Sequence, residues 1–107
     1  IKRVIGLPGE AVCYENDQLY VNNQPIAEPY LTKNRKKDHE TMPYTTNFDS
    51  KELLMQEKLP KDSYFVLGDN RRMSKDSRSF GAIHADQILG KAQFVYYPLT
   101  HMKIIPK

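Results

Sequence analysis

The chain alternates between short apolar stretches and residues that form turns, and this pattern constrains its fold more than any other feature. Glycine, proline or paired Asn and Asp residues follow most of the apolar stretches. Such interrupted stretches predict β-strands and leave room for short helices only. The strands are predicted at Ile1–Ile5, Val12–Tyr14, Leu19–Val21, Ser63–Leu67 and Lys91–Tyr97. The sequence therefore predicts an all-β fold, either a barrel or a coiled sheet.

The connections between these strands also carry local signals. Pro8-Gly9 suits the central positions of a type II turn. Glu15–Asp17 and Asn22-Asn23 each separate two apolar stretches, which predicts a hairpin or a small meander. Phe80–Ile83 predicts a short extended piece, and Ala85–Ile88 fits a single helical turn.

The region from Thr32 to Lys58 is polar and irregular. Leu53–Met55 is its only apolar anchor by sequence. We therefore expect loops and short elements there, and we expect this region to be the least ordered part of the chain.

Length and composition limit the class of protein. The 107 residues suffice for one domain with a modest core. No apolar stretch approaches the roughly 20 residues that cross a bilayer. Ile1 begins the chain within an apolar pattern, without an initiator Met or a signal peptide, so we expect a fragment of a longer protein.

The single cysteine and the three histidines do not indicate a disulfide or a metal site. Cys13 lies in an apolar alternation and is predicted to be a small core residue. His39, His84 and His101 lack the spacing of metal ligands and are interpreted as surface or half-buried residues. Neither a metal nor a cofactor is expected.

The net charge of +3 is small, and no nucleic-acid partner is expected. The densest positive run is Lys33–Lys37. It is predicted to be a solvated face, with contact to anionic lipid head groups as the alternative.

The segment Gly68–Arg78 differs from the rest of the chain. It directly follows an apolar stretch, and almost all of its residues are polar. Asp69 and Arg71, and again Asp76 and Arg78, are two positions apart, so on an extended backbone each pair shares a side and can form an ion pair. A plain charged surface loop is the alternative.

Two motifs in this chain resemble signatures of the type I signal peptidases, the membrane-bound serine proteases that remove signal peptides from secreted proteins. Gly-Asp-Asn-Arg-x-x-Ser-x-Asp-Ser-Arg at residues 68–78 resembles the last signature segment of that family. Lys-Arg-Val-Ile-Gly-Leu-Pro-Gly-Glu at residues 2–10 resembles a second signature, and Phe94–Pro98 lies where the family has a similar run. The resemblance covers nearly the whole chain and is greatest to the short forms of Gram-positive bacteria.

The resemblance implies an all-β fold of the signal-peptidase type with a small inserted cap. Residues 1–10 and 61–107 would form part of the catalytic core, and residues 11–60 would form the cap. An upstream membrane anchor would hold the catalytic domain on the extracytoplasmic side of the cell membrane. The expected partners are the signal peptides of preproteins, bound as an added strand beside the lysine strand and cut after small residues.

The resemblance also implies the roles of the site residues. Lys2 would be the general base of a Ser-Lys dyad, with Ser74 hydrogen-bonded to its amine and orienting it. A lysine amine accepts a proton only when it is neutral, which an apolar setting favours. Gly68 would allow close approach of the backbone. The supporting ion pairs would be Arg3 with Asp69 and Asp76 with Arg78, and Ile1 would line the pocket for the small side chain before the cut.

The family's nucleophile has no counterpart in this sequence. It is a serine followed by methionine, upstream of the lysine strand, and no Ser-Met pair occurs here; Met73-Ser74 has the reverse order. The oxyanion-hole donors are expected in the same upstream segment, so the isolated chain is expected to be inactive. Glu10 stands where the family usually has Asp, a change that leaves the turn chemistry intact.

Two other functions stay open. A catalytically silent homologue would act as a peptide-binding module, but it would typically lack the lysine. A related self-cleaving repressor shares the Ser-Lys chemistry but would not carry residues 68–78 in this form. A Ser-Met pair in an upstream segment would favour the peptidase, and its absence from the full-length protein would favour the binding module.

Overall fold

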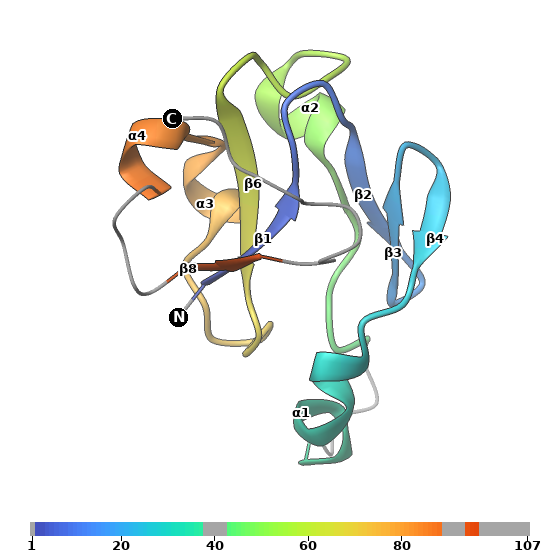
Figure 1. The fold of residues 1–107 in the computed structure, drawn as a ribbon. Coiled ribbons are helices and arrows are strands. Elements are labelled where there is room, and N and C mark those ends of the chain that lie inside the picture. Colours follow the sequence, from blue (N-terminus) through green and yellow to red (C-terminus); the bar gives the residue numbers. More distant parts are fainter. Residues whose placement is uncertain (1, 38–42, 89–93, 97–107) are drawn as a thin grey trace.

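The strands form two four-stranded sheets, shown in Figure 1. The computed structural model describes residues 2–37, 43–88 and 94–96. The first sheet has the order β7-β6-β1-β8 and the second has the order β4-β3-β2-β5. The strands are β1 (Lys2–Gly6), β2 (Val12–Glu15), β3 (Gln18–Val21), β4 (Gln24–Ile26), β5 (Phe48–Asp49), β6 (Ser63–Gly68), β7 (Ile83–His84) and β8 (Phe94–Tyr96). The predicted all-β class is confirmed.

The helices of the described residues are short, and the longest has six residues. The turn predicted at Ala85–Ile88 is present as α4, whereas the extended piece predicted at Phe80–Ile83 is wrong at Phe80, which ends α3. Helix α3 begins at the side-chain cap provided by Asp76. Its sequence has no apolar periodicity, so the apolar pattern did not predict it. The helices are η1 (Pro29–Leu31), α1 (Thr32–Lys37), α2 (Ser50–Leu54), α3 (Ser77–Phe80) and α4 (Ala85–Ile88).

Two of the predicted turns have the left-handed backbone that Asn and Asp tolerate. Asn16 and Asp17, with φ of 51° and 65°, join β2 to β3. Asn22 and Asn23, with φ of 52° and 67°, join β3 to β4. Positive φ at both central residues is the type I′ geometry, whose twist matches that of the flanking strands. The predicted meander is therefore present.

The predicted type II turn at Pro8-Gly9 is also present. The Glu10 amide donates to the Leu7 carbonyl at 3.0 Å, and Gly9 has a φ of 85°. The Glu10 carboxylate accepts a hydrogen bond from the Leu7 amide at 2.7 Å. Glu10 thus closes the turn from both sides, as expected for a residue that keeps the turn chemistry intact.

Strands β1 and β6 bring the two sequence motifs side by side. They are antiparallel, with Lys2 opposite Gly68 and Arg3 opposite Leu67. Opposite residues share a face of a sheet, and successive residues alternate between faces. Lys2 and Gly68 therefore belong to one face of the first sheet, and Arg3 and Leu67 belong to the other.

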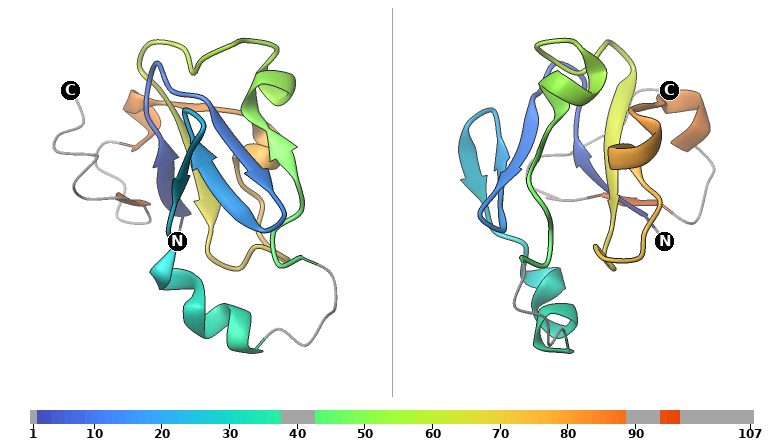
Figure 2. Two further views of the ribbon diagram at one scale, coloured as in Figure 1. Left: turned by 90° about the vertical axis from the view of Figure 1, so that its right-hand side faces the viewer. Right: turned by 180° about the vertical axis from the view of Figure 1, so that it is seen from behind.

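Each face of the first sheet carries its own hydrophobic core. Figure 2 shows α3 and α4 on one side of β1 and β6 and the second sheet on the other. On the Lys2 face the core consists of Val4, Tyr64, Val66, Ile83, Ala85 and Ile88. On the Arg3 face it consists of Ile5, Val12, Tyr14, Leu19, Val21, Leu59, Phe65 and Leu67. The second of these cores joins the two sheets.

The region from Thr32 to Lys58 contains the predicted short elements but has different anchors from those expected. Tyr44 and Thr45 are buried, whereas Leu53 and Met55 are 43% and 89% exposed. Of the predicted apolar anchor, Leu54 alone is partly buried and packs against the core between the sheets, so the prediction holds only in part. A short amphipathic helix turns only part of such a run inward.

Cys13 was predicted to be a core residue, and this prediction was wrong. Its neighbours Val12 and Tyr14 are buried in the core between the sheets, and Cys13 is half-buried on the opposite face of β2. Burial, and the negative charge of Asp49, raise the pKa of the Cys13 thiol.

The two sheets take their strands from different parts of the chain. The first sheet contains strands from residues 2–6 and 63–96, and the second contains strands from residues 12–49. The two parts share one core on the Arg3 face. Which part is catalytic and which is a cap stays a prediction.

Candidate active site

The side chain of Ser74 fills the space that a side chain at Gly68 would need. A Cβ atom at Gly68 would lie 2.1 Å from Oγ of Ser74 and 2.5 Å from its Cβ. Gly68 is opposite Lys2, and the Cβ positions of such a pair lie about 4.5–5.5 Å apart on one face. The Ser74 hydroxyl therefore lies on the Lys2 face of the first sheet.

Lys2 and Ser74 belong to the same face of the first sheet. Lys2 is half-buried, and Val4, two positions along the same face, belongs to the core covered by α4. Among the residues that the structure describes, no hydrogen bond joins the Ser74 hydroxyl to the lysine amine. The predicted roles of both residues stay predictions.

The residues after Ser74 fold back along β6 and satisfy backbone groups that no neighbouring strand reaches there. The Val66 amide donates to Oγ of Ser77 at 2.8 Å, and the Gly68 amide donates to Oδ2 of Asp76 at 2.9 Å. The predicted Asp76–Arg78 pair is present, with two hydrogen bonds of 2.8 and 2.7 Å. The backbone is not extended there, because Asp76 caps α3 and Arg78 lies in the first turn of that helix.

The charge state of Asp76 follows from these contacts. The residue is fully buried. Burial alone would raise the pKa of its carboxyl group, but the hydrogen bonds from Arg78 and from the Gly68 amide outweigh it and hold that pKa below its ordinary value. Asp76 is therefore a carboxylate that accepts hydrogen bonds from both.

The predicted Arg3–Asp69 pair is present on the face opposite to Lys2. Nε and Nη2 of Arg3 donate to the carboxylate at 3.0 and 2.8 Å. The guanidinium also lies over the Tyr30 ring, with Cζ 3.8 Å from the ring centroid. The hydrogen bond to Asp69 raises the pKa of Arg3. The charge of Arg3 is thus neutralised on the side of the sheet that faces the second sheet.

The Asp69–Arg71 pair suggested by sequence spacing is wrong. The carboxylate partner of Arg71 is Glu28, with Nη2 2.6 Å from Oε2. The two side chains are 0% and 3% exposed. The spacing argument needed an extended backbone, but the chain turns after Asp69 and takes the two side chains to different partners. Arg71 also donates to the Tyr14 hydroxyl at 2.9 Å, the Thr45 hydroxyl at 3.2 Å and the Gly68 carbonyl at 2.8 Å.

Glu28 was not predicted as a member of this site. It accepts hydrogen bonds from Arg71, from the Tyr30 hydroxyl at 2.6 Å and from the Tyr14 hydroxyl. Burial, with the negative charge of Glu28, raises the pKa of Tyr30, so that hydroxyl stays a donor. The sequence offered one signal that Glu28 could be buried and paired: it is an acidic residue flanked by the apolar stretches Ile26-Ala27 and Pro29–Leu31.

Both edges of β1 are paired over Lys2–Val4. β6 lies along one edge, and β8 runs parallel along the other. A substrate strand bound beside β1 would have to take the place of β8 in this structure. Ile1, predicted to line the substrate pocket, lies outside the described residues.

The predicted histidine positions are tested only at His84, whose side chain is exposed; His39 and His101 lie outside the described residues. Within the described ranges, no group of His, Cys, Asp and Glu side chains could hold a metal ion.

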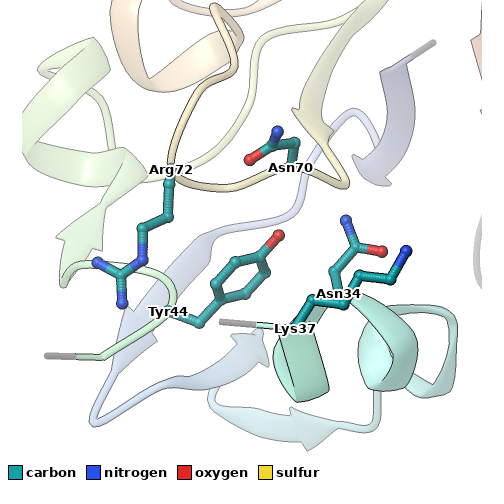
Figure 3. Close-up of a pocket in the computed structure, with 5 residues that line it drawn as sticks. All are labelled: Asn34, Lys37, Tyr44, Asn70 and Arg72. Carbon is teal, nitrogen blue, oxygen red and sulfur yellow. The ribbon is translucent and has the colours of Figure 1, made fainter. Parts of the chain in front are cut away.

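A pocket of about 290 Å³ lies between α1 and the loop that follows β6 (Figure 3). None of its lining residues belongs to the predicted site. Figure 3 shows the Tyr44 hydroxyl directed toward that loop, where it donates to the Asp69 carbonyl at 2.9 Å. The pocket is therefore lined by a residue, Tyr44, that also binds the backbone of the segment Gly68–Arg78. Its lining residues are Asn34, Lys37, Tyr44, Asn70 and Arg72.

Residues 1–97 match the family model described as signal peptidase, peptidase S26. The chain belongs to the signal peptidase family. The chain is 48% identical over 108 residues to signal peptidase IB of Staphylococcus aureus strain N315, covering 96% of this chain and 56% of that protein. It is 44% identical over 104 residues to signal peptidase I of Bacillus amyloliquefaciens, covering 96% and 54%. The family predicted from the two motifs is confirmed.

A solved structure agrees with this membership. A crystal structure of a signal peptidase I from Enterococcus faecalis V583 matches with a TM-score of 0.74 and 41% identity, covering 79% of this chain and 74% of that chain. The chain spans about half the length of the curated relatives it matches. Of its described helices, none has the length and apolar character needed to cross a bilayer.

Proposed function

We propose that this chain carries the base of a Ser-Lys dyad in a peptidase that removes signal peptides from secreted preproteins. Lys2 takes the proton of the nucleophilic serine, and Ser74 orients the lysine amine. The nucleophile and the oxyanion-hole donors come from a segment outside these 107 residues, since no Ser-Met pair occurs among them. The isolated chain is inactive.

One observation carries this proposal. Ser74 Oγ occupies the side-chain position of Gly68, and Gly68 lies opposite Lys2 in the register of β1 and β6. A neutral hydroxyl in that place can take one hydrogen of the amine and direct its lone pair without adding charge. Catalytic hydrogen bonds are often open in a free enzyme and tighten when substrate binds.

The surroundings of Lys2 support a base. Val4 continues the same face into an apolar core. Arg3, the adjacent cation, is paired with Asp69 on the other face of the sheet. A carboxylate beside Lys2 would instead hold the amine in its charged form.

The proposed substrate is an extended preprotein segment with small residues before the cut. It binds as a strand along β1, on the edge that carries β8 in this structure. The peptidase acts at the extracytoplasmic surface of the cell membrane, where an anchor outside this chain holds it.

The first experiment measures hydrolysis of a signal-peptide substrate by the isolated chain and by the complete peptidase. We expect no turnover by the chain alone and loss of turnover by the complete Lys2→Ala variant, whereas Lys61→Ala, at an exposed lysine, retains it. Turnover by the isolated chain that disappears on Lys2→Ala would show that the nucleophile was assigned to the wrong segment.

The second experiment isolates the role of Ser74. In the complete peptidase, Ser74→Ala should lower kcat by about 10² to 10⁴ with KM nearly unchanged, because it removes orientation of the base and leaves the substrate groove intact. Ser79→Ala, at an exposed serine, is the matched control. Wild-type kcat in Ser74→Ala would contradict the proposed role.

A further inference from the structure

We infer that the buried Arg71–Glu28 pair sets the position of Ser74 against Lys2, which makes Arg71 and Glu28 positioning residues for the proposed base. The inference deepens the proposed function and rests on it. Gly68 links the pair to Ser74. The Ser74 side chain packs against Gly68 on the Lys2 face, and the Gly68 carbonyl oxygen accepts a hydrogen bond from Nε of Arg71 at 2.8 Å.

Groups from residues 11–60 hold the start of the charged segment by its backbone. The Tyr44 hydroxyl donates to the Asp69 carbonyl at 2.9 Å and accepts from the Arg71 amide at 3.3 Å. The Arg71 side chain adds the bond to the Gly68 carbonyl. The Tyr44 hydroxyl thus holds two backbone groups of residues 68–71, and the Arg71 side chain holds a third.

The Arg71 side chain is itself held in one geometry. Within the described part of the chain, its other hydrogen bonds run to the Tyr14 hydroxyl, the Thr45 hydroxyl and the Glu28 carboxylate. A planar guanidinium with fixed donor directions transmits position better than a lysine amine, which rotates freely at the end of a flexible stem. Because Arg71 and Glu28 are almost fully buried, water cannot replace either partner.

Ser74 lies between two anchors that meet at one residue. Arg71 binds the Gly68 carbonyl at the near end of the segment, and Asp76 binds the Gly68 amide at the far end. The hydroxyl between them must reach the proposed amine within hydrogen-bond distance. A displacement of about 1 Å at a reacting group costs up to about 100-fold in rate. Loss of the near anchor is thus expected to weaken catalysis without touching the substrate.

The test uses the complete peptidase and compares Arg71→Met and Glu28→Gln with Arg35→Met. Arg35 is the matched control: it contacts Glu28 and Tyr14 as well, but among the described residues its polar partners are Tyr14, Asp17 and Glu28, with none in residues 68–78. We expect Arg71→Met and Glu28→Gln to lower kcat by about 10- to 100-fold with KM within about twofold. Arg35→Met should keep kcat within about twofold of wild type.

Two further readouts separate positioning from stability. The acid limb of the pH profile of kcat should shift in Arg71→Met and Glu28→Gln but not in Arg35→Met. Only the first two variants change the position of Ser74 relative to the proposed base, Lys2. Arg71→Lys should restore little of the lost kcat, since it returns the charge without the planar fork. Unchanged kcat and pH profile in folded Arg71→Met and Glu28→Gln, even with reduced thermal stability, would overturn the inference.

Variants that fail to fold are replaced by milder ones. If Arg71→Met does not fold, Glu28→Gln and Tyr44→Phe decide: a lowered kcat in either supports positioning, and wild-type kcat in both overturns it. Lys2→Ala in the same assay tests the underlying proposal. If Lys2→Ala keeps turnover, the proposed function fails; if it abolishes turnover while Glu28→Gln and Arg71→Met keep theirs, only the positioning role fails.

Discussion

Gly68 meets three constraints that no other residue type satisfies together. Its backbone packs against the Ser74 side chain, its amide donates to Asp76, and its carbonyl accepts from Arg71. The requirement is space: an added Cβ would overlap the Ser74 side chain on the face shared with Lys2. The close approach of the Ser74 side chain therefore explains why β6 ends in a glycine.

The first prediction concerns this close packing. Gly68→Ala should destabilise the chain by about 1–3 kcal/mol, because Ser74 must move out of a packed site. In a Ser74→Gly background the same change should cost much less, since the overlapping atoms are gone. Urea unfolding of the four chains gives the coupling free energy. An equal cost in both backgrounds would contradict the close packing.

The second prediction concerns the pH dependence of the Asp76–Arg78 pair. The pKa of Asp76 in the folded chain lies below its ordinary value of 3.8. The pair's contribution is therefore complete above that value and is lost as the pH falls through the folded pKa. Asp76→Asn should cost on the order of 1–3 kcal/mol at pH 7, and the difference should shrink below about pH 4.

Urea unfolding from pH 7 to pH 2 checks this prediction. Asp86→Asn is the control, because the Asp86 side chain is 88% exposed. A difference between wild type and Asp76→Asn that stays constant down to pH 2 would show that the carboxylate charge is unimportant.

Single-residue pairings were only partly predictable. Arg3–Asp69 was expected from the family resemblance, and Asp76–Arg78 from both the resemblance and the sequence spacing; both pairs form. The Asp69–Arg71 pair inferred from spacing alone does not form, because local spacing cannot reveal Glu28, 43 residues away in sequence. The partner of a buried arginine depends on the tertiary fold and not on spacing in the sequence.

At the scale of elements, the sequence predicted those with local signals. The Asn-Asp and Asn-Asn turns, the Pro-Gly turn and strand β6 follow from turn chemistry and apolar runs. Helix α3 and the edge of β6 depend on Asp76 and Ser77, whose side chains cap the helix or bind strand amides. Such elements have no periodic pattern and become visible only when the fold is known.

Helix α1 provides the prediction at this scale. None of its residues is buried. Among the described residues, Arg35 connects it to the second sheet and its neighbours through contacts with Asp17, Glu28 and the Tyr14 hydroxyl. The amides of Lys36 and Lys37 should therefore exchange with solvent at least about 100-fold faster than those of Phe65 to Leu67. Arg35→Met should increase this difference in exchange rate further. Hydrogen exchange that shows equal protection would mean that α1 is packed against another part of the protein.

At the scale of the whole molecule, the division at residues 10/11 and 60/61 separates two sheets but not two cores. Ile5, Phe65 and Leu67 of the first sheet share one cluster with Leu19 and its neighbours in the second. The Arg71 network adds buried polar interactions across the same junction. The family resemblance supplied this boundary, and sequence patterns could not show that a shared core bridges it.

A shared core predicts that the two sheets unfold together. Leu19→Ala, a cavity-forming change in the second sheet at a side chain 1% exposed, should lower the free energy of unfolding by about 2–5 kcal/mol. If the chain is one cooperative unit, amide protection should fall equally at Tyr14 in the second sheet and at Phe65 in the first, because both amides open only through global unfolding. Val66→Ala, in the core on the Lys2 face, should lower protection at the same two positions. Faster exchange at Tyr14 alone in Leu19→Ala would instead show that the second sheet unfolds as a separate unit.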